Sequence, residues 1–304
     1  MSKKRVVVTG LSAYTPLGLG LEASWDALIR GESGIGPITS FDAGEYTARI
    51  AGELKGFNPE DHIPAKEARR MDRFAQIGVV AGLDVLKHAG YIINDDNARR
   101  VGCMLSVGLG GLRTIETFHT KLMEAGPSRI SPFLIPMLIS NIAPGQISIF
   151  TGAKGTNLAI TSACSSGLHA IGYAYSEILL GRCDAVITGG VESTITPLGV
   201  AGFTALKALS TSRNDDPTRA SRPFDKDRDG FVMGEGAGFL LLESLESALE
   251  RKATIYGEVC GFGATADAFH ITAPDENGEG LANAMRLAVE EGGIALADID
   301  HIKA

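Results

Sequence analysis

Residues 157–180 read NLAITSACSSGLHAIGYAYSEILL, and this stretch decides the fold. The apolar run Asn157–Thr161 predicts a buried strand, and the run Gly167–Leu180, rich in Ala, Gly and Leu, predicts a helix. Cys164 lies in the turn between them, where the free N–H groups and partial positive charge of a helix N-terminus favour thiolate over thiol. A cysteine on such a turn, like the serine elbow of hydrolases, indicates covalent acyl transfer. The alternative is a buried structural cysteine, because cysteine is among the residues most often buried.

The same alternation of apolar runs and helical patterns extends along the chain. The apolar runs are continuous rather than alternating, which is typical of strands covered on both faces. Strands that alternate with helices favour an α/β fold with a substantial parallel sheet. The predicted strands are Val6–Thr9, Val101–Val107, Asn157–Thr161, Ala185–Thr188, Gly238–Leu242 and Tyr256–Gly261, and the predicted helices are Leu21–Arg30, Ala68–Ala89, Gly111–Glu124, Gly167–Leu180, Leu245–Arg251 and Gly280–Gly292.

Composition and charge exclude several classes of function. The chain has 304 residues, enough for one large or two ordinary domains, and its net charge of −8 argues against nucleic-acid binding. Its four cysteines lie far apart, with no CxxC pair and no histidine at metal-ligand spacing, so we expect a reducing compartment and no metal site. We find no signal peptide and no apolar stretch near the roughly 18 residues of a membrane span. These features predict a soluble, cytoplasmic protein.

Two partial matches to binding motifs lack residues that those motifs require. Val6–Gly10 could open a dinucleotide site, but no GxGxxG follows it, and the chain has no GxxxxGK[ST] phosphate loop. Asp225–Gly230 matches the first half of a calcium loop, but Gly236 stands where that loop requires glutamate. We interpret Ser210–Gly236 instead as a charged functional loop closed by internal Asp–Arg pairs.

A basic stripe and one histidine are further candidates. The stripe has the spacing of one helix face and is either solvated or a docking patch for an acidic partner. His169 follows Cys164 by five residues, so on a helix it points about 140° away from the sulfur and is a poor general base. The stripe consists of Lys66, Arg69, Arg70 and Arg73.

Several longer motifs occur in a fixed order along the chain. They are Val7–Gly10 with Thr15–Gly18, Arg70–Phe74, Gly108–Gly111, Ile130–Phe133, Thr161–Gly167, Gly189–Ser193, Ala208–Thr211 and Ser221–Gly238. Together they resemble the elongating β-ketoacyl-acyl-carrier-protein synthases, in particular the type II enzymes of bacterial fatty-acid synthesis. This resemblance favours the nucleophile over the structural interpretation of Cys164.

The resemblance implies a thiolase-like fold of two similar βα halves in α-β-α-β-α layers, usually as a homodimer. Residues 1–252 would form the first half with the nucleophile, and residues 253–304 the beginning of a truncated second half. It also implies a two-stage reaction without a cofactor or metal. An acyl chain moves from carrier-protein pantetheine to the cysteine, and malonyl-carrier protein then loses CO2 and attacks the acyl thioester.

The resemblance assigns roles by position. Leu109, Phe133 and Ile135 would touch the acyl pocket, and Phe203 would belong to a gate beside Cys164. Thr272 would lie near the pantetheine arm. The face that docks acyl-carrier protein would consist of Lys66, Arg69, Arg70, Arg129 and Lys207.

The family's two catalytic histidines and a late Gly-Phe-Gly-Gly segment lie beyond a strand that resembles Ile299–Ala304. We therefore expect residues 1–304 by themselves to be inactive in condensation. Two alternatives stay open. One is a related type I or polyketide ketosynthase, and the other is a non-catalytic chain-length partner, although such partners lack the nucleophile.

Overall fold

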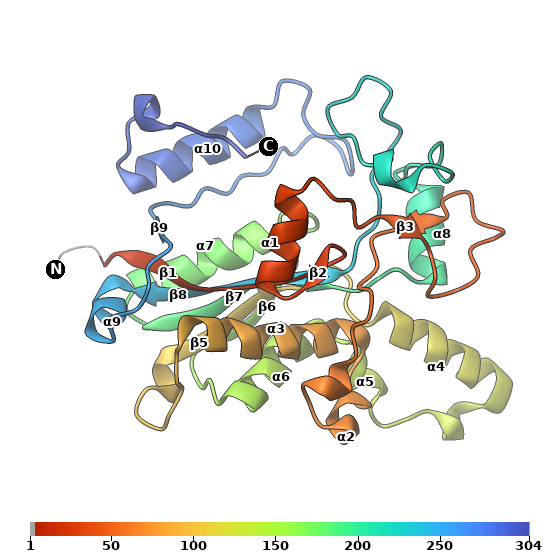
Figure 1. Cartoon of the computed structure of the whole chain (residues 1–304), viewed down its shortest axis with the longest axis horizontal. Coiled ribbons are helices and arrows are strands. Elements are labelled where there is room, and N and C mark those ends of the chain that lie inside the picture. Colours follow the sequence, from red (N-terminus) through yellow and green to blue (C-terminus); the bar gives the residue numbers. More distant parts are fainter. Residues whose placement is uncertain (1–3, 304) are drawn as a thin grey trace.

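The computed structural model describes residues 4–303 as a mixed sheet with helices on both faces (Figure 1). The strands are β1 (Val6–Thr15), β2 (Gly18–Leu19), β3 (Gly36–Pro37), β4 (Ile50–Ala51), β5 (Val101–Ser106), β6 (Asn157–Ile160), β7 (Ala185–Glu192), β8 (Gly236–Ser244) and β9 (Gly257–Val259). The helices are α1 (Leu21–Ile29), α2 (Ala65–Ala68), α3 (Arg73–Ala89), α4 (Leu112–Ala125), α5 (Leu134–Leu138), α6 (Ile142–Thr151), α7 (Ser166–Leu179), α8 (Pro197–Ala205), α9 (Leu245–Glu250) and α10 (Glu279–Gly292).

The main sheet has the strand order β2-β1-β8-β7-β5-β6, and β9 also pairs with β1. Parallel pairing joins β6 to β5 and β5 to β7, whereas β8 pairs antiparallel with both β1 and β7, so that β1 runs in the same direction as β7. The expected parallel sheet is therefore interrupted by the antiparallel strand β8, and the short strands β2 and β9 are also antiparallel to β1. Continuous apolar runs show that both faces are covered, but they carry no information on strand direction.

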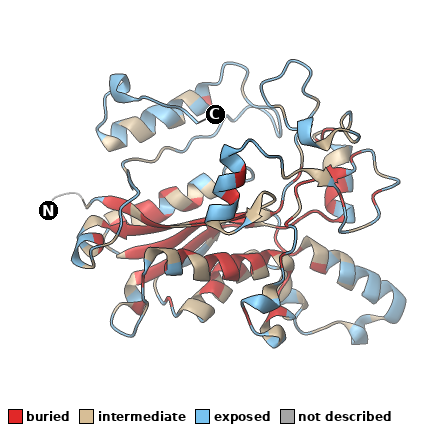
Figure 2. Cartoon of the chain, viewed as in Figure 1, coloured by how far each residue is buried: buried red, intermediate tan, exposed pale blue. Residues whose placement is uncertain are grey.

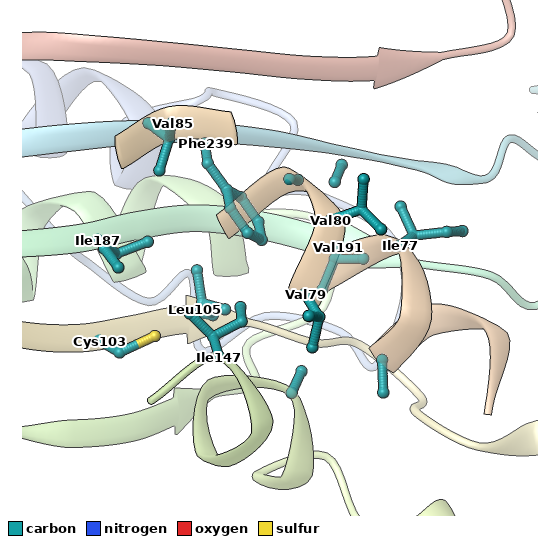
Figure 3. Close-up of a cluster of buried hydrophobic side chains, with 14 of the residues drawn as sticks. Ile77, Val79, Val80, Val85, Cys103, Leu105, Ile147, Ile187, Val191 and Phe239 are labelled. Atoms are coloured by element: carbon teal, nitrogen blue, oxygen red, sulfur yellow. The ribbon is translucent and has the colours of Figure 1, made fainter. Parts of the chain in front are cut away.

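The hydrophobic core lies between the sheet and the helix pair α3 and α6 (Figures 2 and 3). Ile147 of α6 packs so closely on α3 that a Cβ at Gly82 would lie 2.9 Å from its side chain. Phe239, Leu105 and Ile187 contribute the sheet side of this cluster and are fully buried. The opposite face of the sheet is covered by α7. This close packing fixes the ends of the strands, where the candidate site lies.

The helix predicted over Ala68–Ala89 begins only at Arg73, and Ala68 is the last residue of the separate helix α2. The chain leaves helical geometry between α2 and α3 because Asp72 is tied to α4: its Oδ2 accepts hydrogen bonds from the Thr114 amide at 3.0 Å and the Thr114 hydroxyl at 2.6 Å. Arg73 begins α3 and turns inward to Glu235, with Nη2 2.8 Å from Oε1. The basic stripe is therefore not one helical face, and Arg73 does not belong to it.

Two further expectations need correction. β6 is an edge strand whose Asn157 and Leu158 are exposed, so it is not buried on both faces. The loop Ser210–Gly236 does contain Asp–Arg pairs, since Asp216 lies 3.9 Å from both Arg213 and Arg219, but its closest contacts are those of Asp229, which accepts hydrogen bonds from the Ser210 hydroxyl and the Thr211 and Ser212 amides. Burial opposes ionisation of Asp229, but these hydrogen bonds outweigh it and lower its pKa well below the ordinary range.

The segment after β9 begins a further layer over α7 (Figure 1). Phe262 packs on Gly172 of α7, where an added Cβ would lie 2.3 Å from the ring. A Cβ at Gly261 or Gly263 would lie 2.0 Å from a carbonyl oxygen of α10, Ala288 or Ala284 respectively. Residues 261–263 therefore lie in close contact with α7 on one side and α10 on the other.

Candidate active site

Cys164 lies on the turn between β6 and α7 and is exposed. The turn is tight: Ala163 has a left-handed φ of 53°, which is unfavourable for a residue with a Cβ. Ser166 holds it, because its hydroxyl accepts from the Ser162 amide at 2.7 Å and donates to the Ala163 carbonyl at 2.6 Å. This local network presents the thiol at the start of α7 rather than in the core.

Cys164 lines a cavity of about 780 Å³ at one end of the main sheet. The walls come from the ends of β5 and β7, the start of β8 and the end of β1. Leu109 and Phe203, two of the residues expected in the acyl pocket and gate, line the same cavity. Phe133, Ile135 and Thr272 are not among its lining residues.

Those three residues lie elsewhere on the surface. The Arg70 guanidinium stacks 4.9 Å above the Phe133 ring, and Ile135, on α5, is 58% exposed. Thr272 lies in an exposed loop, where its amide donates to His270 Nδ1 at 3.1 Å.

Two carboxylates line the cavity, and sequence reasoning gave them no role. Glu192 Oε2 accepts a hydrogen bond from the Leu109 amide at 2.7 Å, yet burial outweighs this contact and raises the pKa of Glu192. Glu235 accepts hydrogen bonds from Arg73 and, at 2.6 Å, from the Ser193 hydroxyl. Burial would raise the pKa of Glu235, but these bonds outweigh it and the pKa is lowered. Glu192 lies in the motif Gly189–Ser193 and Glu235 in the motif Ser221–Gly238. These two motifs were the sequence signal that could have identified both carboxylates.

His169 lies on α7 and contacts other groups than the thiol. Its Nδ1 is 2.5 Å from the Ser162 hydroxyl oxygen, and its ring packs edge-on against Phe262 with centroids 5.9 Å apart. Among residues 4–303, no histidine lines the cavity of Cys164. The described part of the chain therefore places no histidine in this cavity to act as a general base for Cys164.

The residues expected to dock a carrier protein are exposed or half-buried but do not form one continuous stripe. In α2 and just after it, Arg69 lies 3.9 Å from Glu60, and Arg70 lies 3.5 Å from Glu67. Arg129 belongs to the short turn between α4 and α5, which leads to the Phe133 that Arg70 stacks on. Lys66 is exposed on α2, whereas Lys207 follows α8, which Figure 1 sets apart from α2.

Residues 4–303 contain neither a cluster of metal-ligating side chains nor a membrane-spanning helix. No group of three or more His, Cys, Asp or Glu in residues 4–303 is arranged to hold a metal ion. No helix of this part has the length and hydropathy that a membrane crossing needs.

A cysteine presented on a strand-to-helix turn, facing a cavity in an α/β fold, defines a class of enzymes that transfer acyl groups through a thioester. Comparison with known families is more specific. The family model Beta-ketoacyl synthase, N-terminal domain, matches residues 3–248, and Beta-ketoacyl synthase, C-terminal domain, matches residues 256–304. The chain belongs to the β-ketoacyl synthase family, and its fold is thiolase-like.

Curated relatives agree with this assignment. The chain is 49% identical over 304 residues to 3-oxoacyl-[acyl-carrier-protein] synthase 2 of Vibrio cholerae, covering 100% of this chain and 73% of that protein. It is 50% identical over 301 residues to the protein of the same name from Staphylococcus aureus, covering 99% and 72%.

Solved structures show the same fold. A β-ketoacyl synthase from Burkholderia phymatum superposes with a TM-score of 0.89 at 34% identity, covering 99% of this chain and 73% of that one. A type II polyketide ketosynthase in complex with its acyl-carrier protein superposes with a TM-score of 0.85 at 26% identity, covering 97% and 72%.

Proposed function

We propose that the protein is a condensing enzyme of fatty-acid elongation that carries the growing chain as a thioester on Cys164. The observation that carries this proposal is the exposed thiol on its strained turn, facing the cavity that Leu109 and Phe203 also line. The thiolate attacks the carbonyl of an acyl-carrier-protein thioester and expels the pantetheine thiolate. Malonyl-carrier protein then loses CO2, and the carbanion attacks the acyl-cysteine, forming a C–C bond and releasing the Cys164 thiolate. Both substrates arrive as thioesters, so the reaction needs no bound cofactor.

The remaining assignments are proposals of the same kind. Lys66, Arg69, Arg70, Arg129 and Lys207 would contact the acidic carrier protein, and Thr272 the pantetheine arm. Phe133 and Ile135 would reach an acyl pocket completed in a homodimer, in which a second copy would cover the exposed edge strand β6. The protein would act in the cytoplasm, together with its carrier-protein substrates.

A polyketide ketosynthase is the nearest alternative. The type II polyketide ketosynthase is 26% identical to the chain, whereas the two 3-oxoacyl-[acyl-carrier-protein] synthases are 49–50% identical, which favours the fatty-acid role. Rates with fatty-acyl and polyketide-type acyl-carrier proteins separate the two. A non-catalytic chain-length partner is disfavoured by the presence of Cys164.

The thiol assignment is tested by limiting alkylation and by acylation. Cys103 and Cys183 are buried, and burial raises the pKa of the Cys103 thiol, so neither should compete for iodoacetamide. Cys260 is exposed and serves as the internal control, because it lies off the β6–α7 turn and its Sγ contacts the Glu258 carbonyl oxygen at 3.8 Å. Mass spectrometry should find label and acyl group first on Cys164, and C164S should abolish acyl transfer. Faster labelling of Cys260, or acylation of C164S, would contradict the proposal.

A further inference from the structure

The loop between β5 and α4 carries a single side chain into the cavity. Its sequence, Gly108-Leu109-Gly110-Gly111, surrounds one leucine with three glycines. A Cβ at Gly108 would lie 2.7 Å from Glu192 Oε2, and one at Gly111 would lie 2.5 Å from the Met137 carbonyl oxygen of α5. The loop is thus packed closely between Glu192 and α5. Leu109, the one side chain among residues 108–111, lines the cavity of Cys164.

The Glu192 carboxylate holds this loop by binding the loop's backbone amides. Oε2 accepts the Leu109 amide at 2.7 Å, and the amides of Gly108 and Gly110 also stabilise the carboxylate. The far end of the loop is anchored separately, because Asp72 accepts the amide of Thr114 in the first turn of α4. The position of Leu109 between these two anchors therefore depends on the Glu192 carboxylate.

Stability does not explain why a carboxylate stands at this position. Burial raises the pKa of Glu192 despite its amide partners, so its ionised form is less favourable in the folded protein than in water. Glu53 provides a contrast: burial also acts on it, but its contacts with Thr39 and Ser40 outweigh burial and lower its pKa. A costly carboxylate in the wall of a reactive cavity is typical of a functional group.

We propose that Glu192 is a positioning residue that determines acyl-chain specificity. By holding the amide of Leu109, it fixes how far that side chain extends into the cavity, and hence which acyl chains Cys164 accepts. This inference rests on the proposed transfer of acyl groups to Cys164.

The test measures acylation of Cys164 in the full-length protein by intact-mass spectrometry, with hexanoyl-, decanoyl- and tetradecanoyl-carrier protein. In E192Q the amide group keeps the size of the side chain but replaces one acceptor oxygen by a donor. We expect the ratio of the longest-chain to the shortest-chain rate to change by about five- to tenfold, as for the loss of one ordinary intramolecular hydrogen bond. The matched control E53Q removes the same charge from a carboxylate that also binds loop amides, outside the cavity, and should leave the ratio unchanged.

A double-mutant cycle separates positioning from a general structural role. If Glu192 acts through Leu109, then E192Q should change the chain-length ratio in the wild type but add nothing in the L109A background. If E192Q loses its cooperative thermal transition, E192D is tested instead. Its carboxylate oxygens are withdrawn by one methylene, and we expect the same change in the chain-length ratio. An unchanged ratio in the Glu192 variant, or additive effects with L109A, overturns this inference alone. A wild-type protein that no acyl-carrier protein acylates overturns the proposed function together with it.

Discussion

At the scale of single residues, the cavity wall depends on the ion pair between Arg73 and Glu235. The Glu235 side chain is 4% exposed and the Arg73 side chain 24%, and Glu235 also accepts the Leu54 amide at 2.8 Å. Removing the arginine would leave a buried carboxylate without its charged partner. The pair thus joins the start of α3 to the start of β8 beside the nucleophile.

We expect R73M to lower the free energy of unfolding by about 3 kcal/mol at pH 7. The folded-state pKa of Glu235 is lowered, so the stabilisation is present above its ordinary pKa and is lost as the pH falls through the folded value. The difference between wild type and R73M in urea unfolding should therefore be unchanged from pH 7 down to about pH 4.5 and shrink as the pH falls further. The control R100M breaks a more exposed pair, with Asp184, and should cost about 1 kcal/mol or less. A difference for R73M that is independent of pH would contradict this account.

At the scale of elements, the pairing of β7 with β8 requires glycine at one position. Gly189 has φ 134°, and a Cβ there would lie 2.1 Å from the Gly238 carbonyl oxygen. G189A should therefore cost more than about 2 kcal/mol in chemical denaturation. Gly238, in the facing strand, has open space at its Cβ position, so G238A should cost less than about 1 kcal/mol. Equal costs for the two variants would show that strain at Gly189 is not decisive.

The helix α2 and the residues just after it carry a prediction about docking. The ion pairs of Arg69 and Arg70, at 3.9 and 3.5 Å, are exposed and weak, so both guanidinium groups can turn to an acidic partner. R69E/R70E should raise the KM for acyl-carrier protein about tenfold or more while leaving turnover of short pantetheine thioesters nearly unchanged. The control K87E/R99E, at and beyond the opposite end of α3, changes the net charge equally and should leave both substrates unaffected. Equal losses with both substrates in R69E/R70E would indicate a folding role.

At the scale of the whole molecule, the layer over α7 is incomplete within residues 4–303. Leu281 and Leu287 of α10 and Leu168 of α7 are 65%, 44% and 70% exposed. Figure 2 shows α10 mostly exposed, in contrast to the sheet below it. Exposed apolar faces of this kind favour association.

We expect a protein consisting only of residues 1–304 to aggregate and to form no β-ketoacyl product, even with Cys164 intact. Among the described residues no histidine lines the cavity of Cys164, and the chain covers 73% of its Vibrio cholerae relative. Product formation from acyl- and malonyl-carrier proteins, with the Vibrio cholerae relative as the positive control, checks this expectation. Condensation at a rate comparable to the control would refute it.

The sequence by itself determined the family, the thiolase-like fold and the strand–turn–helix placement of Cys164, because local patterns and motif order are properties of the chain. The family resemblance placed Leu109 in the acyl pocket and Phe203 in a gate beside Cys164, and both residues line the cavity of Cys164. Only the tertiary structure decided the antiparallel direction of β8, the break before α3 and the inward turn of Arg73. Each of these depends on a partner far away in sequence: β7 for β8, Thr114 for Asp72 and Glu235 for Arg73. The hydrogen bond from the Leu109 amide to Glu192 is also a feature that only the tertiary structure decided. It joins residues 83 positions apart, and no local sequence pattern encodes such a contact.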